Sequence, residues 1–195
     1  MTPINTLLPG ILDSGITGNL LVNNYLSITT ATVTSGGQTT ITFNSIPQTY
    51  TNLEIRMIGQ NQFSSGSAAG WSSMRVGNGS IDSTSGHYAW HNVYGDGTTV
   101  GAGGNGSDSS MGFARFQFNA TPNSTFGSTV MTILDYTNTT KAKTMKYIGG
   151  YSAISSGQSL SGDGVWTQTS AIDTITFFNG YGFQPYTQFA LYGVK

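Results

Sequence analysis

Short β-type runs, separated by segments rich in glycine, asparagine and proline, recur along the chain and constrain its fold more than any other feature. In residues 53–58, for example, the apolar Leu53, Ile55 and Met57 alternate with polar residues, so an extended chain carries one apolar face. About ten such runs are present, and no segment shows the periodicity of an amphipathic helix. The pattern predicts an all-β fold with two packed sheets, a jelly-roll-like sandwich, and leaves a single closed barrel as the alternative.

The predicted strands follow one another along most of the chain. They cover residues 28–34, 39–43, 53–58, 71–76, 88–94, 111–119, 125–136, 143–151, 165–169, 172–178 and 188–194. The first two runs are joined by a segment containing Gly36 and Gly37, which predicts a β-hairpin. Residues 95–110 are so rich in glycine that we expect a long loop there.

The 195-residue chain carries few charges, and this excludes several classes of function. Charged residues make up 8% of the chain, against roughly 25% in ordinary soluble domains, and the net charge is −1. Such a chain does not offer the basic surface that nucleic-acid binding requires. No apolar stretch approaches the roughly 18 residues of a membrane span. The absence of cysteine excludes disulfides and thiolate metal sites, so the composition favours assembly or adhesion over chemistry.

Residues 1–26 differ from the rest of the chain. Two prolines and a glycine within the first ten residues exclude one continuous helix. The apolar residues that need a covering surface in this segment include Leu7, Leu8, Ile11 and Leu12. We expect residues 1–26 to form an arm, extended or with a short helix, that packs on a neighbouring subunit, and residues 27–195 to form the sandwich domain. The alternative is an edge segment folded onto its own domain.

Two histidines, His87 and His91, stand four residues apart, as in some zinc sites on helices. The residues around them favour a strand, on which positions four apart lie roughly 13 Å from each other. That separation is too long for one metal ion with bonds of about 2 Å. We therefore expect surface or loop histidines, no metal site and no cofactor.

The carboxylates and serines form no recognisable catalytic arrangement. Most of the acidic residues stand beside glycine or at strand ends, where aspartate commonly stabilises turns. Glu54 lies within a predicted strand, and Arg56 on the same face is placed to pair with it. No Gly-x-Ser-x-Gly motif stands between a strand and a helix. We therefore expect that the chain is not an enzyme.

Three aromatic residues near the end of the chain, Tyr181, Phe183 and Tyr186, stand in a segment that contains glycine and proline. We expect a loop there, in which aromatic side chains are less easily explained by the core. If the rings are exposed, they are candidates for a protein interface or for stacking on a sugar. If the loop folds back under the sandwich, the rings belong to the core. Both alternatives stay open.

Three segments carry a family resemblance. They read TVTSGGQTTITFNSIPQTYTNLEIR at 32–56, LDYTNTTKAKT at 134–144 and FALYGVK at 189–195. Together with Trp166 and residues 172–176, these segments resemble β-sandwich virion proteins of tailed bacteriophages, notably those of aquatic and cyanobacterial hosts. The resemblance covers about residues 28–195 and is weakest at 60–125. It implies a structural virion component and provides no catalytic residue.

The resemblance, the short chain and the separate arm together predict a capsid decoration, or cement, protein on the capsid surface. We expect a homo-oligomer, in particular a trimer, that binds the major capsid protein and bridges neighbouring capsid subunits. The arm and the loop aromatics would bury surface at the seams between subunits. The alternative is a tail-fibre or other appendage module on the tail that binds host-surface glycans. Neither interpretation includes a nucleic-acid or membrane partner.

Overall fold

The computed structural model describes residues 24–62, 69–118, 125–153 and 156–195, and the regular elements in this part of the chain are thirteen strands. The strands are β1 (Tyr25–Thr32), β2 (Gln38–Phe43), β3 (Asn52–Gly59), β4 (Ala69–Asn78), β5 (Ser80–Ile81), β6 (Tyr88–Gly95), β7 (Val100–Asp108), β8 (Met111–Gln117), β9 (Gly127–Ile133), β10 (Lys143–Ala153), β11 (Ser156–Trp166), β12 (Thr174–Phe183) and β13 (Gln188–Val194). They form two antiparallel sheets packed against each other, which confirms the predicted all-β sandwich. None of the described residues belongs to a helix that is long and apolar enough to span a membrane.

The order of the strands is that of a jelly roll with additions. The larger sheet has eight strands in the order β1-β13-β3-β9-β10-β11-β6-β7, and the smaller has five, β2-β12-β4-β5 with β8 also paired to β4. The steps β1 to β2, β3 to β4, β8 to β9 and β12 to β13 each pass from one sheet to the other. These eight strands make up the two Greek keys of a jelly roll, and the remaining strands are insertions between them.

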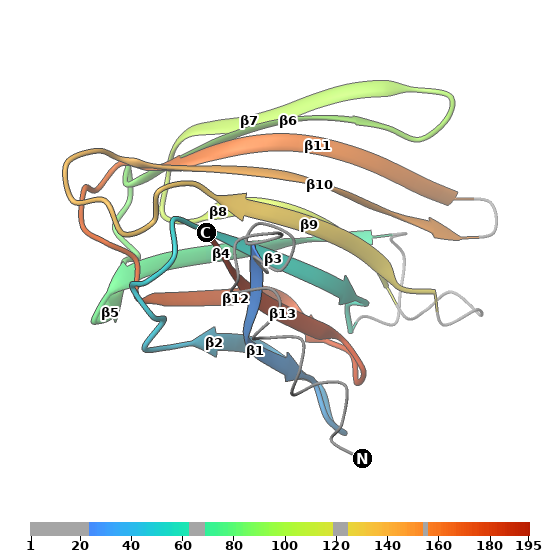
Figure 1. The fold of residues 1–195 in the computed structure, drawn as a ribbon. Helices are drawn as coiled ribbons and strands as arrows, with labels where there is room; N and C mark the ends of the chain where they lie inside the picture. Colours follow the sequence, from blue (N-terminus) through green and yellow to red (C-terminus); the bar gives the residue numbers. More distant parts are fainter. Residues whose placement is uncertain (1–23, 63–68, 119–124, 154–155) are drawn as a thin grey trace, which may run out of the picture.

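Four inserted strands, β6, β7, β10 and β11, widen the larger sheet beyond β9, and we call them the extension. β10 and β11 form one antiparallel pair, β6 and β7 form another, and β11 joins the two by pairing with β6. The extension lies along one side of the molecule, at the top of Figure 1. β8 packs against β10, β11 and β6, so this strand of the smaller sheet covers part of the inner face of the extension.

The structure corrects three local predictions. β1 pairs with β13 and β2 pairs with β12, so the segment with Gly36 and Gly37 connects the two sheets and does not close a hairpin. Both glycines have positive φ angles, 94° and 73°, which make this sharp change of direction accessible. The loop predicted at 95–110 contains β7, and β11 begins well before the strand predicted at 165–169.

Aromatic rings fill the space between the two sheets of the jelly roll. Phe177 of β12 is fully buried and has a ring neighbour on three other strands. Its ring centroid lies 6.0 Å from that of Phe43, 5.6 Å from that of Phe113 and 4.8 Å from that of Phe189. Burying one such side chain contributes about 1.5–3 kcal/mol to folding, so this cluster is a main source of cohesion.

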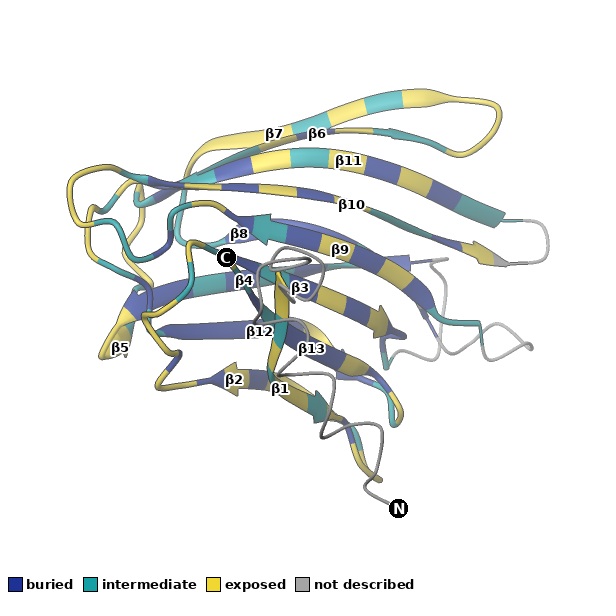
Figure 2. Cartoon of the chain, in the orientation of Figure 1, coloured by how far each residue is buried: buried dark blue, intermediate teal, exposed yellow. Residues whose placement is uncertain are grey.

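The strands of the larger sheet present alternate side chains to the core and to the outside, as the bands of colour along β9, β10 and β11 show (Figure 2). On β3 the prediction is confirmed: Leu53, Ile55 and Met57 are buried and Glu54 and Arg56 face outward. The Arg56 Nε donates to a carboxylate oxygen of Glu54 over 2.7 Å, as the two-residue spacing suggested.

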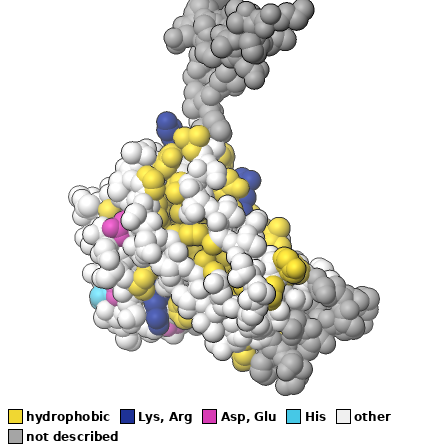
Figure 3. Space-filling model, turned by 90° about the horizontal axis from the view of Figure 1, so that it is seen from below, with side chains coloured by type: hydrophobic (Ala, Val, Ile, Leu, Met, Phe, Trp, Pro, Cys, Tyr) yellow, Lys and Arg dark blue, Asp and Glu magenta, His cyan; other side chains and the backbone are white. Residues whose placement is uncertain are grey.

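The low charge of the sequence is also visible on the surface. Figure 3 looks onto the side where β1 and β2 lie, and it shows hydrophobic side chains in a band with few charged groups around it. On β1, Ile28 and Ala31 are half-buried and pack against the core. Exposed polar groups are mostly hydroxyl and amide groups, in keeping with the 8% of charged residues.

The predicted arm falls mainly outside the described residues. Leu7, Leu8, Ile11 and Leu12 belong to residues 1–23, so their role in an interface stays a prediction. β1 begins at Tyr25, two residues before the predicted start of the sandwich domain at residue 27.

Candidate functional site

The outer face of the eight-stranded sheet carries an aliphatic row in line across neighbouring strands. The register places Val130 of β9 opposite Ile148 of β10, Ile148 opposite Ser161 of β11, and Ser161 opposite Val93 of β6. The exposed fractions are 39% for Val130, 65% for Ile148 and 58% for Val93. Large aliphatic side chains are therefore aligned on the face where this sheet meets solvent.

A broad depression of about 710 Å³ lies over this row. The side chains that flank the aliphatic row in it are polar, and they come from the next row across the sheet: Thr132, Lys146, Asp163 and His91. Two smaller depressions continue it, one toward Val100 at the β7 edge and one toward Ile58 and Tyr192 on β3 and β13. We call the three together the outer-face trough.

The trough is hollow because small residues stand between larger ones. Ser161 lies between Ile148 and Val93 in the row, so the surface drops at β11. On β7, Gly104 lies opposite the outward-facing His91, and an added Cβ there would come within 2.6 Å of the imidazole ring. The serines and glycines of the extension, which make the sequence read as a loop, therefore shape this surface.

An aromatic and cationic cluster stands at the other end of the same face. The guanidinium carbon of Arg56 lies 4.9 Å from the ring centroid of Tyr192 and 5.6 Å from that of Tyr25. The hydrogen bond to Glu54 raises the pKa of Arg56 above its ordinary value, so the group stays charged. This cluster marks the boundary of the trough on the side of β1.

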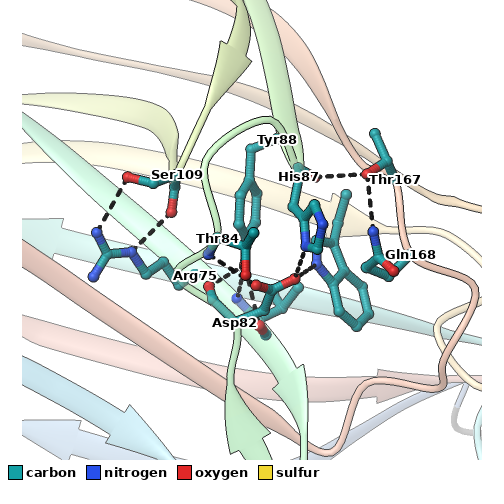
Figure 4. A network of polar contacts seen from close by, with 10 residues as sticks. Arg75, Asp82, Thr84, His87, Tyr88, Ser109, Thr167 and Gln168 are labelled. Atoms are coloured by element: carbon teal, nitrogen blue, oxygen red, sulfur yellow. Dashed lines mark hydrogen bonds and ion pairs between the residues drawn. The ribbon is translucent and has the colours of Figure 1, made fainter.

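A second candidate is a polar network at the base of the extension (Figure 4). Asp82, in the connection from β5 to β6, lies between His87 and Thr84: its Oδ2 is 2.6 Å from the His87 Nδ1, and its Oδ1 accepts the Thr84 backbone N–H over 2.9 Å. The Trp166 indole donates to the same Oδ2 over 2.8 Å. The Tyr88 hydroxyl donates to the backbone oxygen of Asp82 over 2.9 Å.

The electrostatics of this network favour a permanently ionised carboxylate. Burial alone would raise the pKa of Asp82, but the hydrogen bonds from Thr84, Trp166 and His87 outweigh it and hold the pKa far below its ordinary value. Burial raises the pKa of Tyr88 above its ordinary range. The two groups therefore keep fixed protonation states near neutral pH.

An aspartate bound to a histidine Nδ1 is also part of hydrolase triads, which need a hydroxyl at the other ring nitrogen. Among the described residues, the His87 ring makes its only hydrogen bond to Asp82. The backbone oxygen of His87 accepts from the Thr167 N–H over 2.9 Å, which links the start of β6 to the end of β11. We interpret the network as a structural tie that holds the extension to the smaller sheet.

The other predicted structural roles for carboxylates agree with the geometry. Asp96 accepts the backbone N–H groups of Thr98 and Thr99, and Asp173 accepts that of Gly79. Within the described ranges, no group of three or more histidine and acidic side chains could hold a metal ion. His91 is exposed on β6, whereas His87 is half-buried at the start of that strand.

The three aromatic candidates near the end of the chain have different environments. Phe183 is fully buried in β12, 5.0 Å from the Phe189 centroid, so of the two alternatives the core position holds for this ring, and it is not a contact residue on the surface. Tyr181, also in β12, is 47% exposed and meets Phe118 edge-to-face at 5.0 Å. Tyr186 is 80% exposed in the turn between β12 and β13.

Tyr186 also has an unfavourable backbone conformation. Its φ angle is +71°, and the Thr187 N–H donates to the Gln184 oxygen across the turn over 3.1 Å. Pro185 followed by a residue with positive φ is the geometry of a type II turn, which normally places glycine or asparagine there. An exposed aromatic ring held in a strained conformation makes Tyr186 a candidate contact residue.

Comparison of the chain with protein-family models, with curated proteins and with solved structures finds no match. Val93, Val130 and Ile148, which form the aliphatic row, are not among the site residues predicted from the sequence. The only sequence signal was an aliphatic residue on the polar side of three separate strands.

Proposed function

We propose that this chain is a structural component of a tailed-bacteriophage particle, a capsid decoration protein that bridges and stabilises neighbouring capsid subunits. The observation that carries the proposal is the outer-face trough. Contiguous exposed apolar surface on a soluble domain is a mark of a protein interface. A broad face whose centre is lined by Val93, Val130 and Ile148 and whose rim carries polar and charged groups such as Lys146 suits contact with another protein surface better than contact with a small polar molecule.

The rest of the molecule supports a mechanical role. The aromatic cluster around Phe177 holds the two sheets together, and the Asp82 network ties the extension to that framework. A rigid domain with a broad contact face can bridge subunits without changing shape. Repetition of the same contact around a shell then adds avidity, so each single contact can be weak.

The proposal is tested by locating the chain on particles. Antibodies raised against the recombinant chain would be used for immunogold labelling of purified particles, and quantitative mass spectrometry would count its copies. We expect hundreds of copies spread over the shell, with the major capsid protein as neighbour in cross-linking. A handful of copies at the tail would instead support an appendage module, and absence from particles would overturn both.

A second function, binding of host-surface glycans by a tail appendage, is favoured by one observation. Tyr186 is 80% exposed in a strained turn, and exposed aromatic rings are common platforms for sugar stacking. This function predicts that the isolated chain binds a host glycan on an array and that Tyr186→Ser abolishes the signal. Val130→Ser, on the outer-face trough, is the matched control and should leave glycan binding unchanged.

A further inference from the structure

The outer-face trough has the dimensions of an extended peptide. It crosses from β13 to β7, and seven strands at the usual spacing span about 29 Å. About nine residues of extended chain cover that distance at roughly 3.3 Å per residue. A single segment of chain could therefore cover the aliphatic row from one side to the other.

Residues 1–23 have a composition that matches this surface. Nine of them are isoleucine, leucine or valine, and Asp13 is the only charged side chain. In the trough, Lys146 makes no ion pair with any of the described residues, although it lines the depression beside Ile148. Lys146 stands opposite Asp163 on β11, but the described residues show no ion pair between the two, so the Lys146 ammonium group is open to the carboxylate of an aliphatic segment.

The direction of β1 helps to decide whether the segment that covers the trough comes from the same copy or from a neighbouring copy. The Lys195 N–H donates to the Asn24 oxygen over 3.1 Å, so the chain still runs alongside the final residues of β13 at Asn24. The aliphatic row meets β1 at Thr30, through Ala190 and Arg56, about 20 Å further along the strand. At Asn24 the described chain is thus about 20 Å from the row, and β1, followed toward the N-terminus, runs away from the trough of its own copy.

We propose that residues 1–23 of one copy bind in the outer-face trough of a neighbouring copy. Aliphatic side chains of the segment cover Val130, Ile148 and Val93, and Asp13 pairs with Lys146. Each copy gives one segment and receives one, so the contact propagates around a closed ring of copies. This inference rests on the assembly role proposed above, and it names the surface through which copies are joined.

The absence of cysteine from the chain allows a clean test by cross-linking. Full-length Leu12→Cys and full-length Ile148→Cys would be mixed and treated with a short bismaleimide. We expect covalent dimers that contain one chain of each variant, at least tenfold above the yield with Ser83→Cys, which places an exposed thiol beside the Asp82 network. A chain that carries both Leu12→Cys and Ile148→Cys would be treated in the same way. Cross-links that form only within this doubly substituted chain, or no cross-links in either experiment, would overturn the proposal.

A second measurement uses the mass of the full-length protein in solution, by light scattering over a dilution series. We expect Ile148→Lys to weaken self-association at least tenfold, with Ser83→Lys as the control that leaves it unchanged. A synthetic peptide of residues 1–23 should dissociate the unmodified assembly. Since Ile148 is exposed, its replacement should leave thermal unfolding of the sandwich nearly unchanged, so a lost assembly is not a lost fold.

The results separate this inference from the proposed function. If the mixed cross-links form and the chain is absent from particles, the assembly surface stands and the decoration role fails. If the chain covers the shell and neither cross-links nor peptide competition are seen, the decoration role stands and the segment exchange fails.

Discussion

The interior of the sandwich differs between its two ends. Aromatic and aliphatic side chains fill the space between the sheets at the end that is formed by β1, β2, β3, β12 and β13. Around the extension, the space between the sheets also holds polar groups. The Phe177 cluster belongs to the first end. Toward the extension, Ser72 and Thr129 are buried, and no hydrogen-bond partner for their side chains is found among the described residues. Burial there raises the pKa of Tyr147 to about 12.

The outer surfaces show the opposite trend. The extension and the neighbouring β9 carry the aliphatic row of the trough, while on β3 and β13 the outer face carries the charged pair Glu54 and Arg56 beside Tyr192. The side of the molecule near the extension therefore combines a more polar interior with an outer face that carries the aliphatic row.

Loss of a ring at the centre of the aromatic cluster should have the largest effect. Phe177→Ala removes a side chain with ring neighbours on both sheets, so we expect the free energy of unfolding to fall by about 3–5 kcal/mol. Chemical denaturation followed by tryptophan fluorescence measures this change. Phe178→Ala is the matched control, because Phe178 is half-buried on the opposite face, and it should cost about 1 kcal/mol. Equal losses would remove the distinction between the two faces of β12.

The tie between the two ends should have the next largest effect. Asp82→Asn weakens the charge-assisted hydrogen bonds to His87 and Trp166, and we expect a loss of about 2 kcal/mol. Asp96→Asn, in an exposed turn, is the control and should cost less. If the extension can open by itself, hydrogen exchange in Asp82→Asn should accelerate in β6 and β11 before it does in β12.

The same carboxylate predicts a pH dependence. Its pKa is lowered in the folded state, so it contributes its full stability above the unfolded value of about 3.9 and loses it as the pH falls below that value. Thermal unfolding from pH 6 to pH 3 should therefore show a steeper fall for the unmodified chain than for Asp82→Asn. Parallel curves would mean that Asp82 adds nothing specific to the tie.

The strands that could be predicted from the sequence are those whose local pattern of apolar and polar residues is enough to identify a strand. The alternation of Leu53, Ile55 and Met57 identified β3 because one face of that strand is buried and the other is not. In β7 and β11, glycine and serine replace the apolar residues of such a pattern, since neighbouring side chains such as Tyr94 lie over the glycines. Local propensity therefore indicated loops where sheet pairing makes strands.

The candidate site depended on information that is not local. The aliphatic row exists because the register aligns Val93, Val130 and Ile148 from three strands that are far apart in the sequence. The Gly36–Gly37 segment likewise fits either a hairpin or a crossing between sheets, and only the partners β13 and β12 decide. The short spacing of Asp82, Thr84 and His87 was a readable signal of a turn, but Trp166 completes the network from a distant strand.

A gain in stability should follow from correcting the polar interior near the extension. Thr129→Val replaces a buried hydroxyl without a partner among the described residues by a methyl group, and we expect about 1 kcal/mol of added stability. Thr176→Val is the matched control on β12, where the hydroxyl lies 2.8 Å from that of Thr42, and it should cost about 1 kcal/mol. If both substitutions changed the free energy of unfolding in the same direction, the interior would not differ between the two ends of the sandwich.

The smallest expected effect concerns Tyr186, where strain lies in the end of the sandwich that includes β12 and β13. Tyr186→Gly relieves the positive φ angle of +71°, against an entropy cost in the unfolded chain, so we expect a net gain of about 0.5 kcal/mol. Tyr186→Asn keeps a residue that tolerates this conformation and also removes the ring. If both variants are more stable, the tyrosine is retained at the expense of stability, and a binding role is favoured. A loss of stability in both would mean that the ring stabilises the turn, and the argument for Tyr186 as a contact residue would fail.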